Sequence, residues 1–112
     1  MKKTLLTIVA LFSVCTVSIA HASDDTVQIT LVAQDGKFTP TEIKVPAGKR
    51  VELTVENKGT SAEEFESKEL KREKVVPAGK TVKIVLGTLK KGTYKFFGDY
   101  HADTAKGVII AE

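Results

Sequence analysis

Apolar and polar residues alternate along most of the chain after residue 26. Val27, Ile29 and Leu31 alternate with Gln28 and Thr30, which is the period-two pattern of a half-buried strand. The same alternation predicts five further short strands, at residues 43–45, 51–55, 82–86, 94–96 and 108–110. No segment after the amino-terminal region has an apolar stripe with a 3.6-residue period, so the pattern predicts an all-β protein.

Turn-forming residues separate these segments. They are Asp35-Gly36, Asn57-Lys58-Gly59, Lys91-Gly92 and two Pro-Ala-Gly stretches at residues 46–48 and 77–79. Proline fixes φ and glycine accepts a positive φ, so the two Pro-Ala-Gly stretches are interpreted as the same local turn used twice. The spacing of strands and turns predicts a small Greek-key β-sandwich or barrel.

The least regular segment covers residues 61–74 and contains five glutamates. We interpret it as a solvated charged loop, and its run of charged residues at 71–74 as solvated too. Within it, Glu64-Phe65-Glu66 has a second interpretation. If these residues lie on a strand, both glutamates face one side and Phe65 faces the other.

Residues 1–22 are predicted to be a secretory signal peptide. They combine two lysines, an uncharged, largely apolar run at residues 5–20 and a small-x-small cleavage signal ending at Ala22. The alternative of lipid anchoring at Cys15 is disfavoured because Val14 stands where such signals need a small residue. Residues 23–112 are then one periplasmic domain that is not inserted in the membrane after cleavage.

Charge and composition narrow the function of residues 23–112. The signal peptide carries two of the 17 basic residues and none of the 14 acidic ones, which leaves a formal charge of +1. The remaining lysines are spread out instead of clustered with aromatic residues, so we expect no nucleic-acid partner. Nucleophile-elbow and phosphate-binding glycine motifs are missing, which argues against hydrolase and nucleotide-binding functions.

His101 is the only histidine after residue 22, and that part of the chain has no cysteine or methionine. It lies close to Asp99 and Asp103 in a polar segment that follows an aromatic strand. Neutral imidazole is a common metal ligand, and carboxylates suit harder ions. The alternative is an ordinary polar hairpin loop that happens to contain a histidine.

Residues 27–112 resemble the cupredoxin superfamily. More narrowly, they resemble the periplasmic cupredoxin-like proteins of bacterial iron-permease systems of the Ftr type and the cupredoxin domain of EfeO-type iron-uptake proteins. The resemblance rests on Phe38-x-Pro40-x-x-Ile43-x-Val45-Pro46-Ala47-Gly48-Lys49, a strand ending at Asn57, Glu64-Phe65-Glu66, Gly92-Thr93-Tyr94, the Phe-Phe-Gly-Asp-Tyr-His run ending at His101, and Lys106-Gly107-Val108. It implies an all-β, cupredoxin-like Greek-key β-sandwich.

The resemblance also implies where metal ligands would lie. Blue-copper cupredoxins have a histidine after the strand that ends in asparagine, then a cysteine, a second histidine and a methionine before the last strand. Here Glu64 lies near the first histidine position and His101 matches the second. Gly98 or Asp99 replaces the cysteine, and Thr104 or Ala105 replaces the methionine. Because type 1 copper needs a thiolate and two histidines, we expect no blue-copper site.

The expected metal ligands are Glu64, Glu66, Asp99 and His101, with Glu63 and Asp103 as reserves. This oxygen-rich set with one nitrogen favours iron, manganese or Cu(II), and the Irving–Williams order keeps copper among the candidates. Tyr100 is expected to donate a hydrogen bond to one of the metal ligands, without binding the metal itself, or to act as an electron relay.

The leading hypothesis is a periplasmic protein that binds iron or copper and helps to oxidise ferrous iron for a membrane permease, with no catalytic residue assigned. A second hypothesis is a non-catalytic metal carrier or adaptor that docks to an iron permease or to a periplasmic iron-binding protein. The third is a β-sandwich that has kept its fold and lost its metal site.

Overall fold

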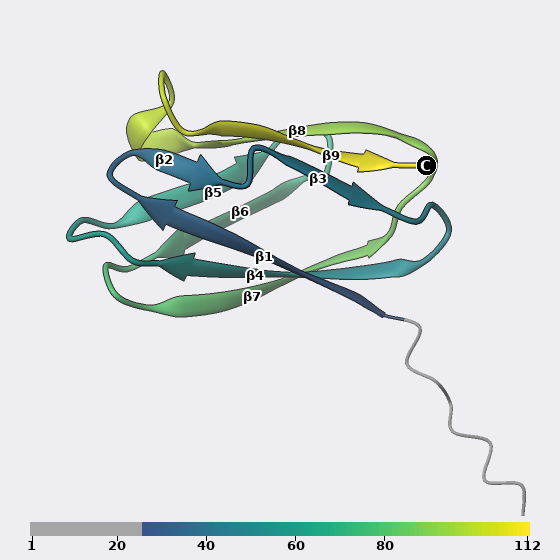
Figure 1. Cartoon of the computed structure of the whole chain (residues 1–112), viewed down its shortest axis with the longest axis horizontal. Helices are drawn as coiled ribbons and strands as arrows, with labels where there is room; N and C mark the ends of the chain where they lie inside the picture. Colours follow the sequence, from purple (N-terminus) through teal and green to yellow (C-terminus); the bar gives the residue numbers. More distant parts are fainter. Residues whose placement is uncertain (1–25) are drawn as a thin grey trace, which may run out of the picture.

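The computed structural model describes residues 26–112, which form two β-sheets packed face to face (Figure 1). The predicted signal peptide, residues 1–22, lies outside the described residues. The elements are β1 (Val27–Gln34), β2 (Lys37–Thr39), β3 (Glu42–Val45), β4 (Arg50–Asn57), β5 (Glu63–Ser67), β6 (Arg72–Val76), β7 (Thr81–Thr88), β8 (Gly92–Gly98), the 3₁₀ turn η1 (Asp99–His101) and β9 (Lys106–Ala111).

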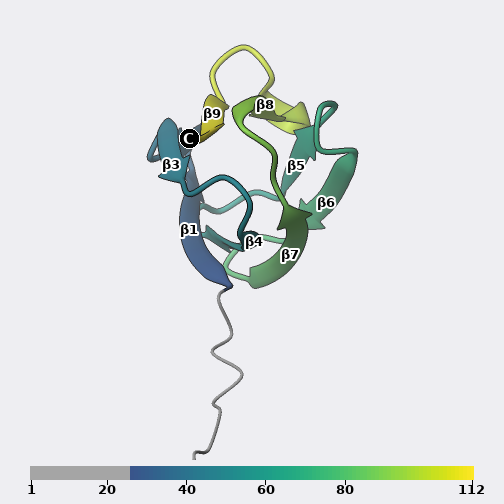
Figure 2. The same cartoon turned by 90° about the vertical axis from the view of Figure 1, so that its right-hand side faces the viewer.

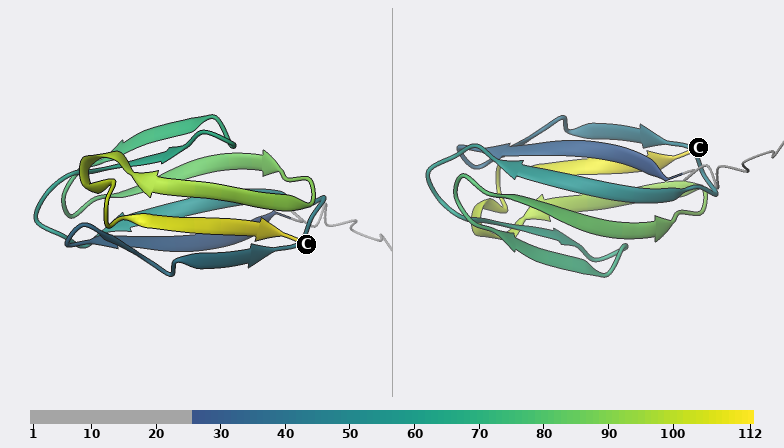
Figure 3. Two further views of the ribbon diagram at one scale, coloured as in Figure 1. Left: turned by 90° about the horizontal axis from the view of Figure 1, so that it is seen from above. Right: turned by 90° about the horizontal axis from the view of Figure 1, so that it is seen from below.

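The strand order confirms the predicted β-sandwich. One sheet has the order β2-β1-β4-β7 and the other β3-β9-β8-β5-β6. β1 pairs in parallel with β4, and β3 pairs in parallel with β9. Seen along the strands, the two sheets curve around a shared interior (Figure 2), and Figure 3 shows each sheet from its outer side.

Alternating apolar side chains fill the space between the sheets. Leu31, Leu53 and Phe65 are fully buried. Three phenylalanines form the centre of this core: the rings of Phe65 and Phe96 stack with centroids 5.6 Å apart, and the edge of Phe38 meets both rings. Such aromatic contacts add to the stabilisation from burial alone. Among residues 26–112, no helix is long and apolar enough to cross a membrane.

Residues 61–74 form a hairpin, so their interpretation as a solvated loop was wrong. β5 pairs with β6 over its whole length and with β8 through Phe65 and Glu66. Phe65, Ser67 and Val76 point inward and are buried. The buried Ser67 hydroxyl donates a hydrogen bond to the Lys95 carbonyl at 2.7 Å. Such a bond removes the cost of burying a polar group.

The turns support the strand assignments. Gly48 and Gly79 both have positive φ, 81° and 71°, which confirms the shared geometry expected for the two Pro-Ala-Gly turns. At the same end of the sandwich as the Gly79 turn, where the Asn57 backbone N–H donates to the Lys80 carbonyl at 2.9 Å, the Asn57 side chain holds the loop that leads to β5. Its amide nitrogen donates to the carbonyls of Ser61 and Val76, both at 2.9 Å.

Candidate metal centre

The alternation of β5 places its glutamates on two sides of the sheet. Phe65 is fully buried, and Glu63, two residues earlier on the same side, is only 5% exposed. Glu64 and Glu66 face outward and are half-buried. The predicted arrangement of Glu64-Phe65-Glu66 is therefore observed.

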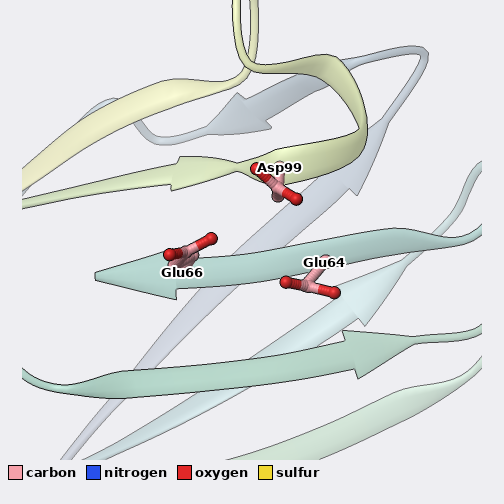
Figure 4. A group of neighbouring side chains, drawn as sticks. All are labelled: Glu64, Glu66 and Asp99. Atoms are coloured by element: carbon pink, nitrogen blue, oxygen red, sulfur yellow. The ribbon is translucent and has the colours of Figure 1, made fainter. Parts of the chain in front are cut away.

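Asp99 joins the two outward glutamates. It is the first residue of η1 and is exposed. Carboxylate oxygens of Glu64, Glu66 and Asp99 all lie within 4.8 Å of one another, and Figure 4 shows the three side chains over the same face of β5. We call Glu64, Glu66 and Asp99 the outer carboxylate cluster. Three carboxylates this close can share a hard or borderline cation.

The negative charge of this cluster changes the protonation of Glu64. A hydrogen bond with Glu73, partial burial and the charges of Glu73, Asp99 and Glu66 raise the pKa of Glu64 from 4.5 to about 7. Glu73 reaches this position because it pairs with Glu66 across β5 and β6. At neutral pH the Glu64 carboxylate is thus partly protonated, and a bound cation would replace that proton.

The raised pKa predicts how stability depends on pH. The folded protein binds a proton on Glu64 between about pH 4.5 and pH 7, where the unfolded chain has released it. The stabilisation from this proton is complete below pH 4.5 and is lost as the pH rises through 7. With a chelator present, we expect the melting temperature to fall over this range. Glu64→Gln should reduce that fall and the control Glu42→Gln should not; equal slopes for all three proteins would contradict the assignment.

His101 lies on the other side of β5, paired with Glu63. His101 Nδ1 is 2.6 Å from Glu63 Oε2, so the imidazole N–H donates to the carboxylate. The other oxygen, Glu63 Oε1, accepts hydrogen bonds from the backbone N–H groups of Glu64 at 3.0 Å and Tyr100 at 3.1 Å. We call Glu63 and His101 the inner pair.

The four expected ligands therefore do not converge as predicted. Among residues 26–112, Glu64, Glu66 and Asp99 form the one group of three or more metal-ligating side chains, and His101 is not in it. The reason is the geometry of η1. A 3₁₀ turn has three residues per turn, so Asp99 and His101, two positions apart, point to different sides. Of the reserves, Glu63 belongs to the inner pair and Asp103 is exposed outside both groups.

Glu63 was expected only as a reserve ligand, although the sequence contains a signal that its side chain points inward. Glu63 lies two positions before Phe65, and residues two apart on a strand face the same side. A strand that buries Phe65 must therefore also turn Glu63 inward. Tyr100, expected behind the ligands, is instead 49% exposed. The contact of Tyr100 with the site is through its backbone N–H.

Comparison with known proteins identifies the family. A family model described as a cupredoxin-like domain matches residues 5–111. The chain belongs to the cupredoxin-like domain family. An uncharacterized protein of Rickettsia prowazekii (strain Madrid E) is 40% identical over 88 residues, which cover 79% of this chain and 70% of that protein.

Solved structures show the same fold at low identity. Auracyanin A, a "blue" copper protein from Chloroflexus aurantiacus, is 16% identical with a TM-score of 0.67, covering 78% of this chain and 99% of auracyanin. A chain of a heme-copper terminal oxidase dimer is 19% identical with a TM-score of 0.69. The match covers 80% of this cupredoxin-like domain chain but 66% of the oxidase chain.

Glu63, Gly98, His101 and Ala105 lie together inside one end of the cupredoxin-like domain. A Cβ atom on Gly98 would lie 2.5 Å from Glu63 Cδ and 2.9 Å from Ala105 Cβ. Ala105 is fully buried, whereas the Thr104 hydroxyl donates to the Gly36 carbonyl at 2.5 Å. We call Glu63, Gly98, His101 and Ala105 the interior group.

The donors of this interior group differ from those of blue copper. Type 1 copper is held by two imidazoles and one thiolate with a weak axial ligand. The interior group of this cupredoxin-like domain offers one imidazole and one carboxylate, and residues 26–112 contain no cysteine or methionine. A polar hollow of about 10 Å³ borders Asn57, Glu63 and His101, which is room for about one water molecule. Residues 26–112 therefore supply neither the thiolate nor the second imidazole of such a centre.

Proposed function

We propose that this cupredoxin-like domain binds iron or Cu(II) at the outer carboxylate cluster and handles ferrous iron before membrane transport. The observation that carries the proposal is the convergence of Glu64, Glu66 and Asp99 within 4.8 Å. Their oxygens suit iron and Cu(II) better than Cu(I), which prefers sulfur ligands. A type 1 copper centre is not part of the proposal, because its sulfur ligand is missing from residues 26–112.

Anionic oxygen ligands favour oxidation of a ferrous substrate. Carboxylates stabilise the more highly charged Fe(III) more than Fe(II), and this lowers the reduction potential of the bound ion. One electron then leaves each ferrous ion for an acceptor, which is dioxygen in a simple assay and bound Cu(II) or a membrane protein in the cell. The proposed location is the periplasm, with an iron permease and a periplasmic iron-binding protein as partners.

The binding prediction uses single carboxylate replacements. We expect the protein to bind Fe(II) anaerobically and Cu(II) in air, and Glu64→Gln and Asp99→Asn each to weaken binding at least about 10-fold, because each removes one anionic ligand. Isothermal titration calorimetry measures the affinity. Glu42→Gln, an exposed glutamate on β3 of the same sheet, is the matched control. Unchanged affinity in both cluster variants would refute the site.

The alternative function is a carrier or adaptor that binds the ion without oxidising it. The exposure of Asp99 and partial exposure of both glutamates favour it, since an accessible site exchanges its ion readily. Dioxygen uptake after addition of Fe(II) separates the two functions. Faster uptake than in buffer, lost in Asp99→Asn, supports oxidation; tight binding without faster uptake supports the carrier.

A further inference from the structure

The inner pair connects the two elements that carry the outer carboxylate cluster. β5 supplies Glu64 and Glu66, and η1 supplies Asp99. Each hydrogen bond between a side chain of β5 and η1 involves Glu63, which accepts from Tyr100 N and from His101 Nδ1. Glu63 also accepts from the backbone of Glu64. One buried carboxylate therefore holds the backbone on both sides of the cluster.

The other hydrogen bonds of the η1 segment do not reach β5: the His101 carbonyl accepts from the backbone N–H groups of Thr104 and Ala105. The pairing between β5 and β8 stops at Phe65 and Gly98, just before Asp99. Gly98, at the amino-terminal cap of η1, provides no side-chain hydrogen bond. In the metal-free protein the charges of Glu64, Glu66 and Asp99 repel one another, which pushes the exposed turn away from β5. The hydrogen bonds of Glu63 oppose that movement.

His101 contributes no atom to the outer carboxylate cluster, because neither of its ring nitrogens joins the oxygens that lie within 4.8 Å of one another. Its Nδ1 is engaged by Glu63, and the adjoining hollow has room for about one water molecule. Its Nε2 has no hydrogen-bond partner. Every buried side-chain nitrogen or oxygen among residues 26–112 has one, so Nε2 is not buried. Nε2 therefore reaches solvent and is not among the atoms that converge with Glu64, Glu66 and Asp99.

We propose that Glu63 and His101 are positioning residues for the outer carboxylate cluster and that His101 is not a metal ligand. The pair holds η1 from inside the sandwich, so Asp99 stays within reach of Glu64 and Glu66. This inference rests on the proposed metal site and adds the residues that preorganise it. Hydrogen bonds that orient ligands in this way usually change metal affinity by about 10- to 100-fold.

The test is a double-mutant cycle with Cu(II) as the probe. We expect Glu63→Ala and His101→Ala each to weaken Cu(II) binding about 10-fold. The double variant should be no weaker than either single variant, because both remove the same support. Glu63→Gln, which keeps an acceptor for the two backbone N–H groups, should retain most of the affinity. Additive losses, or full affinity in Glu63→Ala, would overturn the proposal.

A spectroscopic measurement tests His101 without any substitution. Electron paramagnetic resonance of the Cu(II)-loaded protein should show oxygen ligation without imidazole nitrogen coupling. Nitrogen coupling that disappears in His101→Ala would show that His101 is a ligand, and the proposal would be wrong even if Glu63→Ala fails to fold.

Hydrogen exchange in the metal-free protein separates this inference from the metal site itself. The amides of Glu64 and Tyr100 should be protected, and exchange about 10-fold or more faster in Glu63→Ala, as expected when a fixing hydrogen bond is lost. If no metal binds while this difference is observed, the proposed function fails and the role of the inner pair in holding η1 stands. Equal exchange of Tyr100 in both proteins refutes the positioning role.

Discussion

Phe65→Ala is expected to lower the free energy of unfolding by about 4 kcal/mol, within the range for buried phenylalanine. Phe65 is fully buried, stacks on Phe96 and meets the edge of Phe38. Truncation leaves a cavity that these two rings cannot fill without moving. Urea denaturation of the metal-free protein measures the loss.

Phe97→Ala provides the matched control for Phe65→Ala. Phe97 lies in the next position to Phe96 on β8 and is half-buried on the outer side of the sheet. Its truncation removes less buried surface and leaves no enclosed cavity, so it should cost clearly less. Similar losses for the two variants would mean that the core does not centre on Phe65.

Gly98→Ala is expected to cost about 3 kcal/mol, as for overpacking of a tight interior. The new methyl group would meet Glu63 Cδ at 2.5 Å and Ala105 Cβ at 2.9 Å. Glu63 has little freedom to move, because three hydrogen bonds hold its carboxylate. Thermal and urea unfolding measure the effect.

Gly92→Ala is the control at the other end of β8. Its nearest contacts would be atoms of Tyr94 at 3.8 Å, which is ordinary van der Waals distance, so its stability should change little. In a Gly98→Ala background, Glu63→Ala should cost less than in the original protein because it removes part of the clash. A stable Gly98→Ala protein with an intact inner pair would contradict the crowded geometry.

The sequence allowed the strands to be predicted wherever alternation alone decided them. Val27, Ile29 and Leu31 face one side because a strand has a period of two, and no distant partner is needed to see this. The β5–β6 hairpin was missed because its inward positions include Glu63 and Ser67. A polar residue can be buried only when the fold supplies hydrogen-bond partners. Those partners, His101 and the Lys95 carbonyl, are 38 and 28 residues away.

Strand alternation also explains why only part of the candidate site could be predicted. Glu64 and Glu66 share a face by strand geometry, and Asp99 meets them because both loops lie at one end of the sandwich. Whether these residues bind metal remains a prediction. His101 lies on the inner side of β5 because of the geometry of the short turn η1 and the position of Glu63. Neither follows from the local pattern around residue 101.

The alternation of β5 also protects the protein against pairing in the wrong register. A shift of one residue against β8 would exchange the two faces of the strand. Phe65 would then be exposed to water, and Glu64 and Glu66 would enter the apolar interior without partners, at a cost of several kcal/mol for each buried charge. Such a chain could not remain folded. Copies of this protein that reach the native state therefore carry Glu64 and Glu66 on the outside, so folding in the correct register already places two of the three side chains of the candidate site.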